Sequence, residues 1–166
     1  MFAVEKTTTK KKGFFIMNQD ELKNHCGWVA YNNAQSNELF NMYNNYLDEY
    51  NIECTGDVCV GDEIVFVEAC FVGGWKKPKF SHFEIIQGEI INDSYGADKQ
   101  QHTFTILKKN GEKICRKGRN VYRYLTLRKN RDDFERSKSL NEKHERGLTA
   151  RSQRDARKYN ELNEAV

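Results

Sequence analysis

The sequence contains no long apolar segment and no secretory signal. No run approaches the roughly 18 to 20 apolar residues that a helix needs to cross a membrane. The first residues, Met1 to Lys6, contain no hydrophobic region of the secretory kind. The five cysteines are odd in number and include no C-x-x-C pair, so reduced thiols are expected rather than a disulfide framework. These absences predict a cytoplasmic protein without a membrane anchor.

Motifs of catalysis and metal binding are scarce too. The chain has no nucleophile motif, no phosphate-cradling glycine loop and no Asp-x-Asp cluster. His82, Glu84 and His102 could form an acid–base or metal cluster, but histidines in a basic β-rich region are more often hydrogen-bonded surface residues. Cys54 and Cys59 lack a second Cys or His pair at ligand spacing. We therefore predict no enzyme activity, no metal site and no cofactor.

The small net charge of +3 hides a strongly uneven distribution of charge. Residues 72–131 contain 14 Lys or Arg against five Asp or Glu, a local net charge of +9. Residues 1–71 have a net charge of −6, and residues 132–166 are neutral. A strongly basic middle region is a plausible electrostatic footprint for a polyanion.

Five short strands are predicted in this middle region. Ile64 and Phe66 alternate with Val65 and Val67, so the first strand has an apolar side chain on both faces. Gly88 predicts a bulge or bend in the second strand, and Asn110-Gly111 predicts a hairpin turn between the third and fourth. Short strands joined mostly by turns favour a small closed or half-closed barrel. The predicted strands cover residues 61–71, 83–91, 102–108, 113–116 and 122–127.

The flanking regions predict an acidic α+β unit and a helical tail. In residues 1–56 we expect a hairpin over 2–17 with a triple lysine at its tip, a helix over 19–31 and a second helix over 36–51. The aromatic stripe of that second helix is typical of a core face. Residues 52–60 are interpreted as a connector, and 57–131 as the basic barrel.

The tail, residues 132–166, is rich in charge and poor in apolar residues. Gly147 interrupts the pattern, so two mostly exposed helical segments are expected. Two interpretations stay open. The tail is either a solvated extension or a basic helix face for phosphates or a partner. That face would use Arg146, Arg151, Arg154, Arg157 and Lys158.

The most informative local feature is the loop 73–80, in which two glycines, three lysines and two flat rings alternate. Such interleaving suits a grip on a nucleic-acid backbone, with aromatic rings stacking or wedging against bases. The alternative is that Trp75 and Phe80 close one end of the barrel while the lysines are only solvated. We favour contact because the other turns are basic as well. The predicted nucleic-acid-binding residues are Trp75, Lys76, Lys77, Lys79, Lys108, Lys109, Lys113, Arg116, Lys117, Arg119 and Arg123.

A resemblance supports this interpretation. Residues 61–67 (GDEIVFV), the pair Gly73-Gly74 and residues 88–91 (GEII) resemble the pattern of KOW modules, which are small SH3-like barrels of ribosomal and transcription-elongation proteins. The insert 75–87 is longer than is usual in that motif. In size and arrangement the whole chain also resembles the MotB family of early proteins of T-even bacteriophages. That resemblance implies a non-enzymatic DNA-binding modulator of transcription with little sequence preference, acting in the bacterial host cytoplasm at the nucleoid.

The sequence thus predicts an α+β protein with an SH3/KOW-like β-barrel that binds double-stranded DNA mainly through its phosphate backbone. No recognition helix or base-reading constellation is evident, so weak sequence preference is expected. Host nucleoid proteins or RNA polymerase are further expected partners. Two alternatives remain: a KOW module that binds RNA or the ribosome, and a protein-interaction module that inhibits RNA polymerase or a host defence protein.

Overall fold

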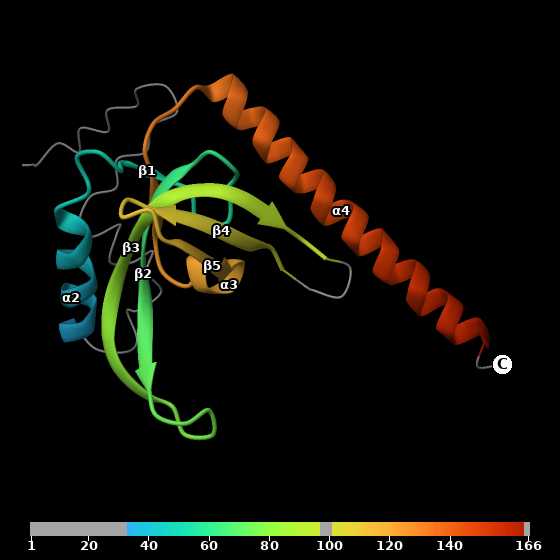
Figure 1. Cartoon of the computed structure of the whole chain (residues 1–166), viewed down its shortest axis with the longest axis horizontal. Helices are drawn as coiled ribbons and strands as arrows, with labels where there is room; N and C mark the ends of the chain where they lie inside the picture. The colour runs from blue at the N-terminus through green and yellow to red at the C-terminus, as the bar shows by residue number, and fades with distance from the viewer. Residues whose placement is uncertain (1–32, 97–100, 165–166) are drawn as a thin grey trace, which may run out of the picture.

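The computed structural model describes residues 33–96 and 101–164 (Figure 1). The predicted hairpin over 2–17, its triple lysine and the helix over 19–31 lie outside the described residues. Three helices and six strands follow one another in the described chain. Within these two ranges, no helix combines the length and the apolar character needed to cross a membrane.

The strands form one antiparallel sheet in the order β1-β6-β2-β3-β4-β5. A meander of four strands, β2 to β5, is followed by the short helix α3, and β6 then returns to pair with β2. The α+β class and the small barrel-like unit with a helical tail are confirmed. The elements are α2 (Asn33–Asn44), β1 (Ile52–Glu53), β2 (Glu63–Val72), β3 (Lys79–Ser94), β4 (Thr103–Lys108), β5 (Lys113–Lys117), α3 (Gly118–Val121), β6 (Thr126–Arg128) and α4 (Asp133–Glu164).

The long strand β3 is curved, and it pairs with β2 and with β4 over different parts of its length. Its first part pairs with β2, and from Gly88 onward it pairs with β4. A Cβ atom at Gly88 would lie 2.6 Å from the Leu107 carbonyl oxygen and 2.7 Å from a methyl group of Ile106. Only glycine therefore allows β4 to approach so closely. The bulge or bend predicted at Gly88 is not found at that residue, since the irregular register of the β3–β4 pair lies between Ile90 and Asn92.

The sheet has a hydrophobic core on each face. Val65 and Val67 pack with α2, whose Tyr43 is fully buried and accepts a hydrogen bond from the Val67 amide at 3.0 Å. Ile64 and Phe66 pack in the opposite direction, into a second cluster inside the curved sheet. The predicted alternation of faces in β2 is confirmed. Of the predicted aromatic stripe, Tyr43 in α2 and Tyr50 beyond the helix are buried.

Several predicted boundaries were wrong. Strand β3 runs from Lys79 to Ser94 rather than over 83–91, because its outer part pairs with β2. The last strand begins at Thr126 rather than at residue 122, because the chain first forms α3, which buries Val121 and is closed by a hydrogen bond from the Tyr122 amide to the Gly118 carbonyl. The predicted connector contains β1, which pairs with β6. Helix α2 ends at Asn44, and turns then place the Tyr50 hydroxyl 2.6 Å from Glu63. In each case tertiary packing outweighs local pattern.

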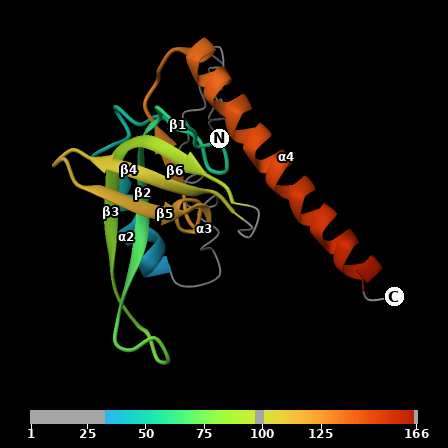
Figure 2. The ribbon, with the colours of Figure 1, turned by 45° about the vertical axis from the view of Figure 1, so that its right-hand side comes forward.

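The tail forms one helix, not two. Helix α4 has 32 residues and runs past Gly147 without a break, over a length of roughly 48 Å. Figures 1 and 2 show it crossing beside the barrel and continuing beyond it. Gly147 is tolerated because it is buried at the point where the helix packs against the sheet, close to His102. Beyond the buried Ala150, side chains up to Asn163 are exposed or half-buried.

This packing predicts that Gly147→Ala stabilises the protein. A Cβ atom at this position would lie 3.5 Å from a nitrogen of Arg151 and 3.7 Å from His102 Nε2, which are ordinary contact distances. Alanine within a helix is favoured over glycine by roughly 0.5–1 kcal/mol. Chemical unfolding in urea should show an increase of that size in the free energy of unfolding. A decrease would mean that α4 docks more tightly at Gly147 than these distances indicate.

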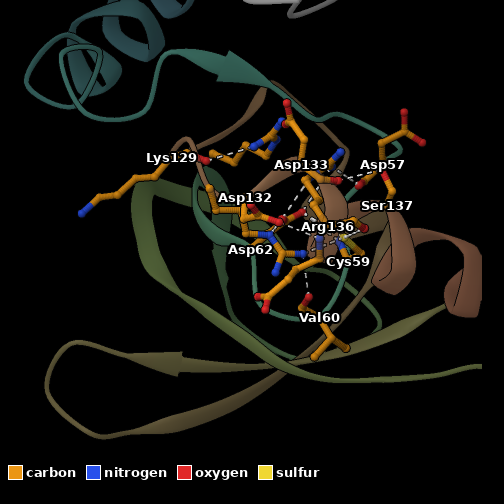
Figure 3. Close-up of polar contacts among 12 residues, drawn as sticks. Asp57, Cys59, Val60, Asp62, Lys129, Asp132, Asp133, Arg136 and Ser137 are labelled. Carbon is orange, nitrogen blue, oxygen red and sulfur yellow. Dashed lines mark hydrogen bonds and ion pairs between the residues drawn. The ribbon is translucent and has the colours of Figure 1, made fainter.

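A buried carboxylate fixes the start of α4 to the barrel (Figure 3). The side chain of Asp62, in the turn before β2, is fully buried, and its Oδ1 lies 2.9 Å from Arg131 Nε and 3.1 Å from Arg136 Nε. Its Oδ2 accepts the backbone N–H of Cys59 at 3.0 Å. Burial would lower the pKa of Arg136, but the charge and hydrogen bonds of Asp62 outweigh it and raise that pKa. One carboxylate thus ties the chain on both sides of the helix start to the sheet.

Two further cations continue this docking along the same helix face. Lys143 is 3% exposed; its ammonium donates to the Gly56 carbonyl at 2.8 Å and lies 5.8 Å from the ring centroid of Phe104. Burial lowers the pKa of Lys143. Arg146 donates to Asp93 at 3.0 Å, and the fully buried Asp93 carboxylate also pairs with His102 at 2.8 Å. Helix α4 is therefore held mainly by the polar contacts of three cations, two of them paired with buried carboxylates, rather than by an apolar stripe.

Candidate nucleic-acid interface

A two-stranded arm, residues 69–83, extends away from the rest of the sheet (Figure 1). Strand β6 pairs with β2 only as far as Phe66, and β4 pairs with β3 only from Gly88. The outer parts of β2 and β3 therefore pair only with each other, from Ala69 opposite Phe83 to the tip. The arm contains no Asp or Glu. The insert predicted at residues 75–87 is the tip of this arm and the first half of β3.

A chain of aromatic rings stiffens the arm and joins it to the core. Phe71 and Phe80 face each other across the strands with ring centroids 6.1 Å apart, and Phe80 lies 4.9 Å from Phe83. Phe83 in turn contacts the buried Tyr124 at 5.8 Å. Such ring contacts contribute beyond their buried area. The outer two rings remain 50% and 44% exposed, so the arm presents aromatic surface to solvent.

The tip displays a tryptophan among lysines. Trp75 is 87% exposed, and Lys76 Nζ lies 5.6 Å from the centroid of its ring. The turn is closed by a hydrogen bond from the Lys77 amide to the Gly74 carbonyl at 3.0 Å, and Gly73 adopts a φ of +96° that favours glycine. Trp75 thus does not close an end of the barrel. The predicted loop residues, including Lys79 opposite Val72, all belong to this exposed arm.

The β4–β5 turn lies apart from the arm tip. Lys108 stands opposite Gly88, and Gly88 lies nine positions after Lys79 in β3, which is roughly 30 Å along an extended strand. Lys108 is also paired with Glu112 at 3.1 Å. Lys109 and Lys113 are exposed. This predicted group could contact the same ligand as the arm only if that ligand is long.

The remaining predicted residues lie around β5 and α3, beside the base of the arm. Arg116 Nε donates to both carboxylate oxygens of Glu68 at 2.7 and 2.9 Å. Strands β5 and β2 are not neighbours in the sheet, so the Arg116–Glu68 pair connects two strands that are separated by β3 and β4. Because Arg116 is paired with Glu68, we assign it a structural role rather than a role in binding. Lys117, Arg119 and Arg123 are exposed.

A small hollow at the base of the arm was not predicted. It encloses about 200 Å³ and is lined by Glu68, Ala69, Phe71, Asn120 and Arg123. The residues come from β2 and from the segment around α3, about 50 positions apart in the chain. Strand alternation places neighbours within one element, but no pattern in a single sequence indicates that these two segments meet.

The possible acid–base or metal cluster does not assemble. His82 lies 3.0 Å from Ser81 Oγ, whereas His102 pairs with the buried Asp93. Glu84 pairs with neither histidine in this arrangement; its carboxylate lies 3.7 Å from the Cys70 thiol. Over residues 33–96 and 101–164, no three His, Cys, Asp or Glu side chains lie close enough together to hold a metal ion. Both histidines are hydrogen-bonded, but only His82 is the exposed surface residue that the sequence led us to expect; His102 is half-buried beside Asp93.

The basic face predicted for the tail is divided between two roles. Arg146 is bonded to Asp93 and contributes to docking of the helix. Arg151 and Lys158 are exposed on the part of α4 that follows the buried Ala150. The cations that dock α4 against the barrel are Arg136, Lys143 and Arg146, and they recur at helical spacing. In the sequence alone this spacing is indistinguishable from an ordinary solvated helix face, because it does not show which acids are buried.

Comparison with known proteins gives two matches. Residues 54–130, which include β2 to β6, match a family described as a domain of unknown function (DUF7699). The chain is also 37% identical over 130 residues to a rice protein (Oryza sativa subsp. japonica) named zinc finger CCCH domain-containing protein 62. The alignment covers 69% of this chain but 18% of the rice protein, so the chain spans less than a fifth of that relative. No solved structure matches the chain. The resemblances to KOW modules and to the MotB family stay predictions.

Proposed function

We propose that this protein is a non-enzymatic module that binds double-stranded DNA with little sequence preference, using the β2–β3 arm. The observation that carries the proposal is the arm itself. It projects from the barrel, contains no acidic residue over 69–83, and displays Trp75 with three lysines at an exposed tip. Exposed rings and cations on a rigid support are the combination that nucleic-acid-binding surfaces use.

The chemistry of the arm suits the phosphate backbone. Lys76, Lys77 and Lys79 supply mobile point charges that neutralise phosphates and release bound counterions. A two-stranded β-ribbon fits the major groove of a duplex, while Trp75 is placed to stack or wedge at a base step. The arm offers no Asn, Gln or Arg for reading base edges in residues 69–83, which supports weak sequence preference.

The test is a titration of purified, nuclease-treated protein against duplex DNA, single-stranded DNA and duplex RNA of equal length. Salt-dependent binding to duplex DNA that does not change with its sequence is the expected result. If the three lysines and about three further cations contact phosphates, log K should fall with log salt with a slope near −5. Tighter binding to duplex RNA would move the proposal to RNA, and no binding to any of them would overturn it.

The exposed rings of the arm also favour a second candidate, a protein-docking role. Phe71, Trp75 and Phe80 are all at least 44% exposed, and tryptophan in particular is enriched at the energetic centres of protein interfaces. A stoichiometric protein complex that survives nuclease treatment and is lost on Trp75→Ala would support this role. The basic charge of the arm favours the nucleic acid.

A further inference from the structure

The hollow at the base of the arm has the size and the walls of a small ligand site. Its volume of about 200 Å³ corresponds to roughly six or seven waters of the bulk liquid. Pockets for drug-sized ligands usually enclose about 300 Å³ or more, so only a compact group would fill it. The hollow opens beside Phe71, four residues before Trp75 along the same strand and turn.

One wall is apolar and flat, and the others are polar. The Phe71 ring is 50% exposed and can stack on a planar ligand. The Asn120 amide offers both a donor and an acceptor. Glu68 contributes a carboxylate that two hydrogen bonds from Arg116 hold in place. An ionised carboxylate accepts about four hydrogen bonds, so about two acceptor positions on Glu68 remain.

The Glu68 carboxylate argues against a phosphate as the ligand. Glu68 is the single acid among the lining residues and Arg123 the single cation, so a phosphate that paired with Arg123 would still lie against the Glu68 carboxylate. A neutral planar group with an N–H donor avoids that repulsion and satisfies the free acceptor positions. Among the parts of a nucleic acid, a base with an exocyclic amino group has this chemistry, and carboxylates accept from the amino group of cytosine in known base contacts.

We propose that the hollow binds one unpaired nucleobase with an exocyclic amino group, while the arm holds the neighbouring phosphates. The inference rests on the proposed function, because the arm must first bind nucleic acid. If the hollow binds a base in this way, a duplex with an extrahelical nucleotide should be a better ligand than a fully paired duplex. An extrahelical base is already unstacked, so it enters the hollow without the cost of leaving the helix. Cytosine is favoured over thymine, since thymine presents a carbonyl oxygen to Glu68 where cytosine presents an amino group.

The test compares three duplexes of one length: fully paired, with a single bulged cytosine, and with a single bulged thymine. The bulged cytosine should bind about tenfold more tightly than the bulged thymine. Glu68→Gln keeps an oxygen for Arg116 but replaces the other acceptor with an amide N–H, so the preference should fall to about threefold or less. Phe71→Leu, which removes the stacking surface, should reduce the advantage of both bulged duplexes over the paired one.

The outcomes separate this inference from the function on which it rests. Equal affinities for the two bulged duplexes, together with salt-dependent binding of the paired duplex, would overturn the base site and leave the DNA-binding arm intact. Replacing the three arm lysines should weaken all three duplexes by a similar factor and keep the preference for cytosine. An unchanged preference in Glu68→Gln, with the variant folded by circular dichroism, would also overturn the inference.

Discussion

Replacing Lys76, Lys77 and Lys79 together by alanine is expected to weaken binding of duplex DNA by roughly several hundredfold at about 0.1 M salt. Each lysine that neutralises a phosphate contributes about 0.9 to the slope of log K against log salt, so the slope should become less steep by about 2.7. The loss of affinity should shrink to roughly 25-fold at about 0.3 M salt, because electrostatic binding weakens as salt rises. Fluorescence anisotropy with a labelled duplex at several salt concentrations measures both quantities.

The matched control removes the same charge from α4. Lys138, Arg151 and Lys158 are exposed on the helix, and their replacement by alanine also reduces the charge by three. Only a small loss of affinity is expected from this variant. An equal loss in both variants would mean that DNA responds to total charge rather than to the arm, and an unchanged slope in the arm variant would remove the three lysines from the interface.

Asp62→Ala is expected to lower the free energy of unfolding by ~3 kcal/mol, a large part of the stability of a small domain. The substitution leaves Arg131 and Arg136, whose side chains are 22% and 14% exposed, without the anion that compensates their burial. It also removes the acceptor of the buried Cys59 amide. Asp62→Asn keeps an acceptor oxygen but not the charge, so a smaller loss is expected. Urea unfolding followed by circular dichroism gives both values.

The comparison variant for this prediction is Glu112→Ala. Glu112 is also paired with a cation, Lys108, but its side chain is 54% exposed, and exposed ion pairs contribute little. Its replacement should change stability by about 0.5 kcal/mol or less. Hydrogen exchange in the first turns of α4 should accelerate in Asp62→Ala and not in Glu112→Ala. Similar effects of the two substitutions would contradict the view that Asp62 fixes the helix to the barrel.

The sequence predicted the strands well where a local pattern decides the structure. Alternation identified β2 and its two faces, and Asn110-Gly111 identified the turn between β4 and β5. It failed where distant contacts decide. Helix α3 forms because Val121 fills the core, and α4 continues through Gly147 because the barrel supports it there. No local pattern contains that information.

The candidate interface was predictable in part. Interleaved aromatic and basic residues marked the loop around Trp75, and the structure places that loop at the exposed end of an arm. Arg116 could not be told from its exposed neighbours, because its partner Glu68 lies 48 positions earlier in the chain. For the same reason, the sequence did not distinguish the docking cations of α4 from a solvated helix face. Their partners, such as the buried Asp93, are distant in the sequence and are identified only by the folded structure.

The fluorescence of Trp75 during a titration with duplex DNA tests the central claim most directly. The chain contains two tryptophans, so Trp28→Phe leaves Trp75 as the single reporter. If the arm binds DNA, the emission of this 87% exposed ring should be quenched or shifted, with saturation at the same concentration as anisotropy of the labelled duplex. Binding by anisotropy with no change in Trp75 emission would contradict the account, because the tip of the arm would then remain in water.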